Sequence, residues 1–370
     1  MNVNYKIIFA TLVIIIFIPT HYCAITETFS SNDEDHDGTP GLLFYSMNSE
    51  NTEYSVARGT AEGTHIVIPS TYKGKPVTRI THDDPASGYP PGGFAGYSTM
   101  TSISIPNTIT SIGWRAFILC TGLTGVTIPN SVIEIGKDAF AGCISLSEVK
   151  FETPSRLSII DIQVFSRCIN LTDINIPDSV ISIAAAAFGD CESLTSITLP
   201  KNLKTIGAGA FANCTSLTSV TIQSKVKNID FNPFLHCLNL KAITVAKKNK
   251  YYSDAGNCLI RLSDKAIITG LSTTVIPNWV EKINYQSFLG FTDLESLIIP
   301  NGVKYLETHP FYGCTNLSSV YIPLSVIRIE PHAFVGFKKL TIYTEHLSKP
   351  DKWHFQWNSS NLPVVWGYKR

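Results

Sequence analysis

Short runs of interspersed apolar and polar residues recur along most of the chain. In residues 194–199, Leu and Ile side chains are interspersed with Thr and Ser, a spacing typical of a short strand with one buried side. Pro200 ends this strand, because proline has no N–H to donate to a ladder. A second apolar pair, Leu203 and Ile206, begins the return path to Phe211. Each unit is therefore predicted to be a short strand, a turn and a returning segment.

The unit repeats with a period of 23 residues. A phenylalanine closes each returning segment, and successive ones are 23 residues apart except for one step of 25 and one of 54. One coil has a buried side too small to be stable alone, so neighbouring coils must stack to bury it. The chain is therefore predicted to be a repeat solenoid of about ten 23-residue coils over residues 66–340. The phenylalanines are Phe94, Phe117, Phe140, Phe165, Phe188, Phe211, Phe234, Phe288, Phe311 and Phe334.

The 54-residue step contains one regular unit and an insertion at about residues 251–274. Two apolar runs flank Ser263 and Asp264 there, which is typical of a β-hairpin. Because an open coil exposes apolar surface and unpaired strand edges, both ends need caps. We expect an N-terminal cap over residues 42–65 and a C-terminal cap over residues 341–370. The aromatic residues expected in the C-terminal cap are Trp353, Phe355, Trp357, Trp366 and Tyr368.

The first residues are typical of an export signal. Lys6 precedes a run of about a dozen apolar residues that ends at Pro19, a length that suits a signal peptide better than a membrane-spanning helix. We expect a signal peptide over residues 1–24, and lipid modification of Cys23 is the alternative. Residues 25–41 are rich in acidic residues and turn formers, so they are expected to be an acidic linker.

The repeat carries a family resemblance. The pattern Ile-Pro-x-Ser-Val-x-x-Ile-Gly-x-x-Ala-Phe-x-x-Cys-x-x-Leu-x-x-Val is nearly complete in residues 128–149. It resembles the BspA-like leucine-rich repeats of bacterial and protist surface proteins. The resemblance implies a curved, leucine-rich-repeat-like stack with a parallel β-sheet, exposure at a cell surface, and adhesion or partner binding. It implies no catalysis.

Composition narrows the classes of function. The 29 Lys and Arg residues balance the 29 Asp and Glu residues, so there is no basic field to attract nucleic acid. Only one apolar run approaches spanning length, and we expect no membrane span in the mature chain. The chain contains no G-x-S-x-G or H-E-x-x-H motif, motifs that would indicate a hydrolase or a zinc protease. The sequence therefore predicts neither an enzyme nor a cofactor.

Seven cysteines each follow a repeat phenylalanine by three residues. In the other units that position holds Tyr97, Phe291 or Phe337, so it is predicted to be a buried apolar slot in which free cysteine acts as a small hydrophobic residue. Side chains on stacked coils point in parallel, which disfavours disulfides between them. This predicted cysteine ladder consists of Cys120, Cys143, Cys168, Cys191, Cys214, Cys237 and Cys314.

The outward residues of the strands form the predicted binding face. Solenoids bind partners through extended surfaces of this kind, and an exposed aromatic residue is a typical interface anchor. We predict an exported, non-enzymatic protein that binds an extracellular protein or glycan through this face. The alternative is a structural or self-assembling cell-surface component, and the sequence leaves the ligand and the oligomeric state open. The candidate residues are Glu148, Lys150, Asp173, Asn175, Thr198, Thr221, Ile298 and Tyr321.

A second alternative is a metal site. Glu307 and His309 recur 23 residues later as Glu330 and His332, and stacking would bring the two imidazoles within about 5 Å of each other. Two His and two Glu side chains are a conceivable ligand set for zinc. The other interpretation is a pair of solvated turns that were duplicated with the repeat.

Overall fold

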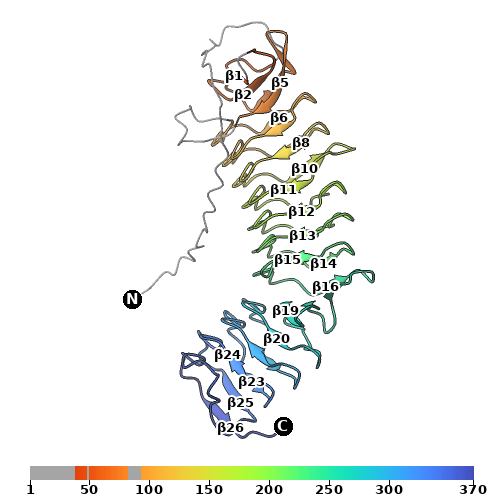
Figure 1. Cartoon of the computed structure of the whole chain (residues 1–370). Helices are drawn as coiled ribbons and strands as arrows, with labels where there is room; N and C mark the ends of the chain where they lie inside the picture. Colours follow the sequence, from red (N-terminus) through yellow and green to blue (C-terminus); the bar gives the residue numbers. More distant parts are fainter. Residues whose placement is uncertain (1–37, 48–49, 82–92) are drawn as a thin grey trace.

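The chain folds as a β-solenoid. The computed structural model describes residues 38–47, 50–81 and 93–370, so the predicted signal peptide and most of the predicted linker lie outside the described residues. The described chain winds into about 13 turns of about 23 residues. Figure 1 shows these turns stacked from β1 (Leu43–Ser46) and β2 (Tyr54–Ala57) at one end to β26 (Val364–Trp366) at the other. The number of turns exceeds the predicted ten.

Helices play no part in the described fold. Among residues 38–47, 50–81 and 93–370, no helix is long and apolar enough to cross a membrane.

Parallel strands line one side of the stack, which we call the strand face. Their pairing keeps repeat-equivalent residues opposite one another, as with Lys150 and Thr127 or Tyr321 and Ile298. A single bridge between Asn175 and Thr198 marks this side in the two coils between β10 and β14. The strands are β3 (His65–Val67), β6 (Ser102–Ser104), β8 (Gly125–Ile128), β10 (Glu148–Phe151), β14 (Ser219–Ile222), β16 (Ala242–Val245), β21 (Ser296–Ile298), β23 (Ser319–Ile322), β25 (Thr341–Thr344) and β26 (Val364–Trp366).

A second set of mostly two-residue parallel strands follows each strand-face segment along the chain, and we call it the second sheet. In most of these strands an exposed or half-buried residue precedes a buried Ile or Leu, which is the alternation that a sheet with one buried face requires. The strands are β5 (Lys75–Ile80), β7 (Ser111–Ile112), β9 (Glu134–Ile135), β11 (Ile159–Ile160), β12 (Ser182–Ile183), β13 (Thr205–Ile206), β15 (Asn228–Ile229), β19 (Ala266–Thr269), β20 (Lys282–Ile283), β22 (Tyr305–Leu306) and β24 (Arg328–Ile329).

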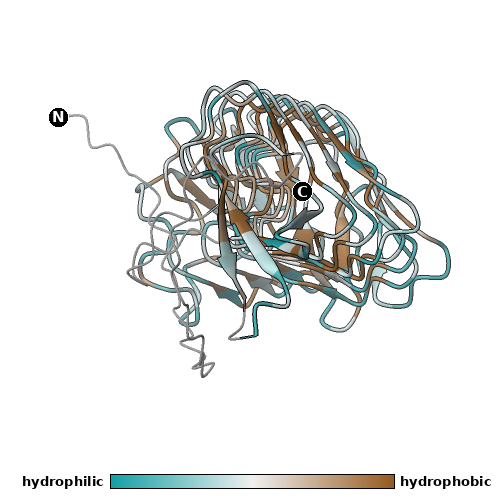
Figure 2. Cartoon of the chain, turned by 90° about the horizontal axis from the view of Figure 1, so that it is seen from above, coloured by the Kyte–Doolittle hydropathy of each residue, from teal (hydrophilic) through white to brown (hydrophobic). Residues whose placement is uncertain are grey.

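The core consists of side-chain ladders that run along the stack. The seven rings from Phe94 to Phe234 are buried, and successive ring centroids lie 5.0–5.6 Å apart with nearly parallel planes. These distances are within the favourable range for aromatic pairs. A second run from Phe288 to Phe334 ends on Trp357, whose ring meets Phe334 edge-on at 5.8 Å. In Figure 2, which looks down the stack, hydrophobic segments recur at matching places in successive turns.

Most of the rings sit in a tight turn with left-handed backbone on both sides. Gln163 and Arg167, two residues before and after Phe165, have φ angles of 56° and 60°. Glycine occupies the corresponding position at Gly142 and Gly209. Residues other than glycine rarely adopt this conformation, so the stacking of the coils must impose the turn on most repeats.

The phenylalanine ladder is interrupted at the insertion. There β17 (Tyr252–Ser253), β18 (Leu259–Arg261) and β19 pair antiparallel, and β19 then pairs with β20 in the second sheet. Gly270 leaves room for the Phe288 ring, because a Cβ atom at that position would lie 2.2 Å from it. Buried Asn232 donates to the Gln286 carbonyl at 3.1 Å and accepts from the Thr269 hydroxyl at 2.6 Å. A polar network therefore joins the two runs of rings.

The two ends close in different ways. At the N-terminal end β1 (Leu43–Ser46) pairs antiparallel with β2 (Tyr54–Ala57), which pairs with β5, and β4 (Thr71–Tyr72) also pairs antiparallel with β5. At the C-terminal end the rings of Trp353 and Trp357 are buried with centroids 4.8 Å apart. Phe355, which was expected to contribute to this cap, is 79% exposed.

Candidate functional site

The strand face presents the predicted row of outward side chains. In its middle turns, the candidate residues from Glu148 to Thr221 are all exposed, while alternate residues such as Val149 point into the core. Lys150 and Glu148 form an ion pair of 2.7 Å along one strand, with both side chains at least 60% exposed. Such a pair contributes about 0–1 kcal/mol, because water screens it. The middle of the strand face is therefore a solvated polar surface.

The C-terminal end of the strand face is apolar and aromatic. Ile298 is 48% exposed and lies directly beside Tyr321 on the next strand. The row continues through Tyr343 on β25 to Val365 on β26, two residues that the sequence analysis did not identify. The ring of Tyr368 meets that of Tyr343 at 4.9 Å. The structure thus joins two predicted residues to a larger patch, which we call the aromatic patch: Ile298, Tyr321, Tyr343, Val365 and Tyr368.

A hydrogen bond fixes the position of Tyr321 in this patch. Its hydroxyl donates to Oε1 of Glu345 at 2.5 Å, and the backbone N–H of Leu324 donates to Oε2 at 2.9 Å. These two donors hold the pKa of the Glu345 carboxyl below its usual range. Loss of hydration and the adjacent carboxylate raise the pKa of Tyr321 to about 12. At neutral pH, Tyr321 is therefore a hydrogen-bond donor and Glu345 is an anion.

The candidate metal ligands are only partly brought together. His309 and His332 stack with their ring centroids 5.5 Å apart, close to the predicted spacing. Glu307 pairs with Lys282 at 2.7 Å, and Glu330 pairs with Arg328 at 2.6 Å. Loss of hydration and the nearby His332 lower the pKa of His309.

The part of the chain that the structure describes contains no group of three or more His, Cys, Asp and Glu side chains arranged to hold a metal ion. Because cations already neutralise both glutamates, the four-ligand hypothesis gains no support from this geometry. It stays a prediction that metal analysis of the purified protein would test.

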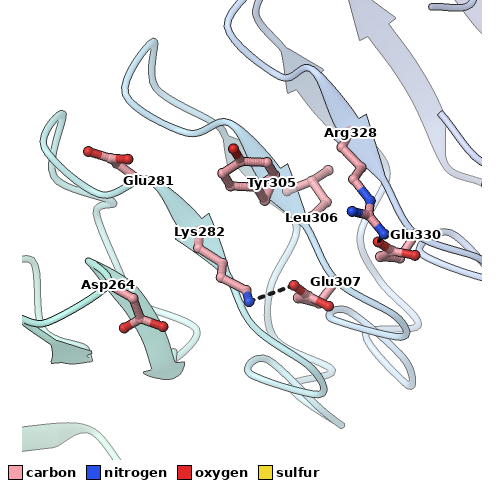
Figure 3. Close-up of a pocket in the computed structure, with 8 residues that line it drawn as sticks. All are labelled: Asp264, Glu281, Lys282, Tyr305, Leu306, Glu307, Arg328 and Glu330. Atoms are coloured by element: carbon pink, nitrogen blue, oxygen red, sulfur yellow. Dashed lines mark ion pairs between the residues drawn. The ribbon is translucent and has the colours of Figure 1, made fainter. Parts of the chain in front are cut away.

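The second sheet carries a charged groove that the sequence analysis missed. Figure 3 shows its lining in the turns after the insertion, where Lys282 points toward Glu307 and Arg328 lies beside Glu330. The groove has a volume of about 510 Å³. At its rim, hydrogen bonds from Lys265 and Lys304 lower the pKa of Glu281 to about 2. Every ionic group named here has an opposite charge next to it, so the groove has no unbalanced charge with which to attract an ion.

The cysteine ladder is buried throughout, as the exposed fractions of its seven members show. Each thiol also donates to the carbonyl of the phenylalanine one coil earlier, for example Cys120 to Phe94 at 3.0 Å and Cys191 to Phe165 at 3.2 Å. Burial raises the pKa of the Cys120 thiol to about 12. The thiols are therefore protonated donors, and all eight cysteines in the described residues are free. The ladder therefore contributes buried, hydrogen-bonded side chains to the core.

Comparisons with known proteins agree with this architecture. The model of the BspA type leucine-rich repeat region matches residues 90–174, 149–256 and 268–356, in six copies. A leucine-rich cell surface protein from Faecalibacterium prausnitzii is similar in structure, with a TM-score of 0.63 and 27% sequence identity over 89% of this chain and 78% of that one. None of the curated protein sequences matches the chain.

Two further structures share the fold. The pneumococcal vaccine antigen PcpA has a TM-score of 0.60 and 19% identity over 92% of this chain and 85% of its own. A leucine-rich repeat protein from Eubacterium ventriosum has a TM-score of 0.50 and 20% identity over 90% and 77%. The family match covers more than half of the chain and includes the ladders described above. The resemblance stated from the sequence is confirmed, and the chain belongs to the BspA-type leucine-rich repeat family, with cell-surface proteins of bacteria among its structural relatives.

Proposed function

We propose that this protein is exported, remains at the cell surface or is secreted, and binds an extracellular protein or glycan through its strand face without catalysing a reaction. The observation that carries the proposal is the in-register row of exposed side chains, which is polar at Glu148 to Thr221 and ends in the aromatic patch. A rigid sheet of this kind presents many side chains in fixed positions, so binding costs little conformational entropy.

The aromatic patch offers side chains that could supply much of the binding energy. Binding energy in interfaces is concentrated in a few aromatic and arginine anchors, with polar residues around them. Tyr321 is positioned before binding by Glu345 and has neighbours in register on both sides. The charged groove on the second sheet is a weaker candidate, because a partner there would have to break existing ion pairs.

The proposal is tested by capture of extracellular matrix and cell-surface material on the immobilised protein. We expect saturable binding that is lost when Ile298→Asp and Tyr321→Asp are introduced together. A matched control is Tyr305→Asp, which places the same charge on the second sheet at a tyrosine that is 37% exposed. The proposal fails if nothing binds saturably, or if the double variant binds as well as the unchanged protein.

Self-assembly is the second candidate, and one observation favours it. β26 is the last strand of its four-stranded sheet, and Val365 on it is exposed. Exposed strand edges pair readily with other chains. Sedimentation separates the two functions, since a monodisperse monomer over a wide concentration range excludes assembly through this edge.

A further inference from the structure

A pocket lies at the C-terminal end of the strand face, beside the aromatic patch. Its volume is about 550 Å³, within the range of small-ligand sites in proteins. Ile298 and Tyr321 line it from the strands, and Asn278 and Asn301 line it from the turns that follow Pro277 and Pro300. The rest of the lining consists of Ile299, Pro300, Gly302, Glu345 and Arg370.

The asparagines of this pocket are one repeat apart, and their turns are packed together. A Cβ atom added to Gly302 would lie 1.7 Å from the Asn278 carbonyl oxygen, so the two turns stack without a gap. Both asparagines are exposed. The repeat therefore places two amide side chains, each able to donate and accept hydrogen bonds, along the same wall.

The ring of Tyr321 is the fixed apolar surface of the pocket. Glu345 holds its hydroxyl, and the Tyr368 ring lies 6.0 Å from it at 70°. Each carboxylate oxygen of Glu345 accepts one hydrogen bond, from Tyr321 and from Leu324, and a carboxylate has about four lone-pair sites, so Glu345 retains capacity to accept further hydrogen bonds from a ligand.

The lining selects for one chemical class of ligand. An anion would meet the Glu345 carboxylate, and a cation would meet the Arg370 guanidinium. A purely apolar ligand would remove water from these groups and from two amides without replacing their hydrogen bonds, which is costly. A neutral ligand with many hydroxyl groups and one apolar face avoids all three penalties. The polarised C–H bonds of such a face pack favourably on the electron-rich face of an aromatic ring.

We propose that this pocket binds a pyranose ring of a neutral glycan, with an apolar sugar face on Tyr321 and Ile298 and its hydroxyl groups on Asn278, Asn301 and Glu345. The inference deepens the proposed function and rests on it, since it names the ligand class of the same strand face.

An extended peptide fits the pocket less well. Peptides that add to a sheet gain most of their affinity from the free backbone groups of an edge strand. In the pocket, the backbone N–H of Ile299 already donates to the Tyr321 carbonyl at 3.2 Å, and that of Leu324 donates to Glu345. The hydrogen bonds on offer come mainly from side chains, which suits hydroxyl groups.

The test is binding of the purified protein to an array of neutral oligosaccharides of glucose, mannose, galactose and N-acetylglucosamine, followed by calorimetry with the best binder. We expect Tyr321→Ala to weaken binding about tenfold or more, as removal of an aromatic anchor does. Tyr321→Phe keeps the ring and should lose less, and Asn301→Ala should lie between these two. Tyr305→Ala, on the opposite sheet, is the matched control and should bind unchanged.

The outcomes separate this inference from the proposed function. If no neutral oligosaccharide binds, or if Tyr321→Ala binds as well as the unchanged protein, the inference is overturned. Capture of a protein through Ile298 and Tyr321 after enzymatic removal of its glycans would also overturn it while leaving the proposed function intact. If no partner binds saturably, both the inference and the proposed function are wrong. Circular dichroism of each variant shows whether it is folded. If Tyr321→Ala is unfolded, the Tyr321→Phe variant still tests the inference.

Discussion

The stacked rings of the core predict a large and specific loss of stability when one of them is removed. Phe188 is fully buried, and its ring lies 5.5 Å from that of Phe165 and 5.4 Å from that of Phe211. Replacing it with alanine deletes the ring from the middle of the ladder, where two neighbours lose a partner. Both neighbouring coils are fixed by backbone pairing, so they have little freedom to collapse into the cavity.

The size of the loss follows from two contributions. Truncation of a buried Phe to Ala costs about 3–5 kcal/mol in well-packed cores. Aromatic pairs contribute about 0.5–1.5 kcal/mol each beyond burial of area, and Phe188 makes two of them. We therefore expect a loss of about 4–8 kcal/mol for Phe188→Ala, which is the sum of the two contributions. Phe188→Leu keeps most of the volume and should lose about 1–3 kcal/mol, which is the sum of the two pair terms.

Denaturation by guanidinium, monitored by far-ultraviolet circular dichroism, measures this change in the free energy of unfolding. Because a solenoid can unfold in parts, hydrogen exchange of the flanking coils should be measured alongside the denaturation curve. Phe231→Ala is the control: this ring belongs to the same family of turns but is 63% exposed, so the expected change is within about 0.5 kcal/mol. A loss below about 1.5 kcal/mol for Phe188→Ala, or one equal to the control, would refute the ladder as the source of stability.

Three further predictions concern the thiols, the insertion and the charged groove. The cysteines of the ladder should resist iodoacetamide at pH 8 until the protein unfolds, and rapid labelling of the native protein detected by mass spectrometry would contradict this burial. Folding raises the pKa of these thiols above 9.0. Their contribution to the free energy of unfolding should therefore be complete below pH 9 and fall as the pH approaches 12. Gly270→Ala should destabilise the protein by about 1–3 kcal/mol because its Cβ would overlap the buried Phe288 ring, whereas Gly125→Ala, with its nearest neighbour at 3.7 Å, should leave the thermal midpoint nearly unchanged. The pKa of Glu281, near 2 in the unchanged protein, should move toward 4.5 in Lys304→Ala and in high salt, as carbon NMR titration would show; a pKa that stays near 2 in both would exclude the ion pairs as its cause.

Much of the core was predictable from the 23-residue period alone. A position that is buried in every coil holds the same or a similar apolar residue in each repeat, and the repeated Phe and Cys positions are buried in the structure. The direction of each thiol was not predictable in this way. The acceptor is the carbonyl of a phenylalanine 26 or 28 residues earlier, and only the stacked backbone shows that the two atoms meet.

The candidate sites were predictable only in part, for physical reasons. Ile298 and Tyr321 were identified because they keep the period, whereas Tyr343 lies 22 residues after Tyr321, in a coil that is one residue shorter before its strand. The charged groove was missed because Lys282, Tyr305 and Arg328 occupy one repeat position with different chemistry in each coil. Their ion pairs depend on side-chain conformations, which a repeat pattern does not encode.

The central claim is that the strand face is the recognition surface, and hydrogen–deuterium exchange of the protein with and without its captured partner tests it most directly. The account predicts slower exchange in peptides that contain β21, β23 and β25, with no change in β20 and β22 on the second sheet. Protection confined to the second sheet, or spread evenly over both sheets, would contradict it.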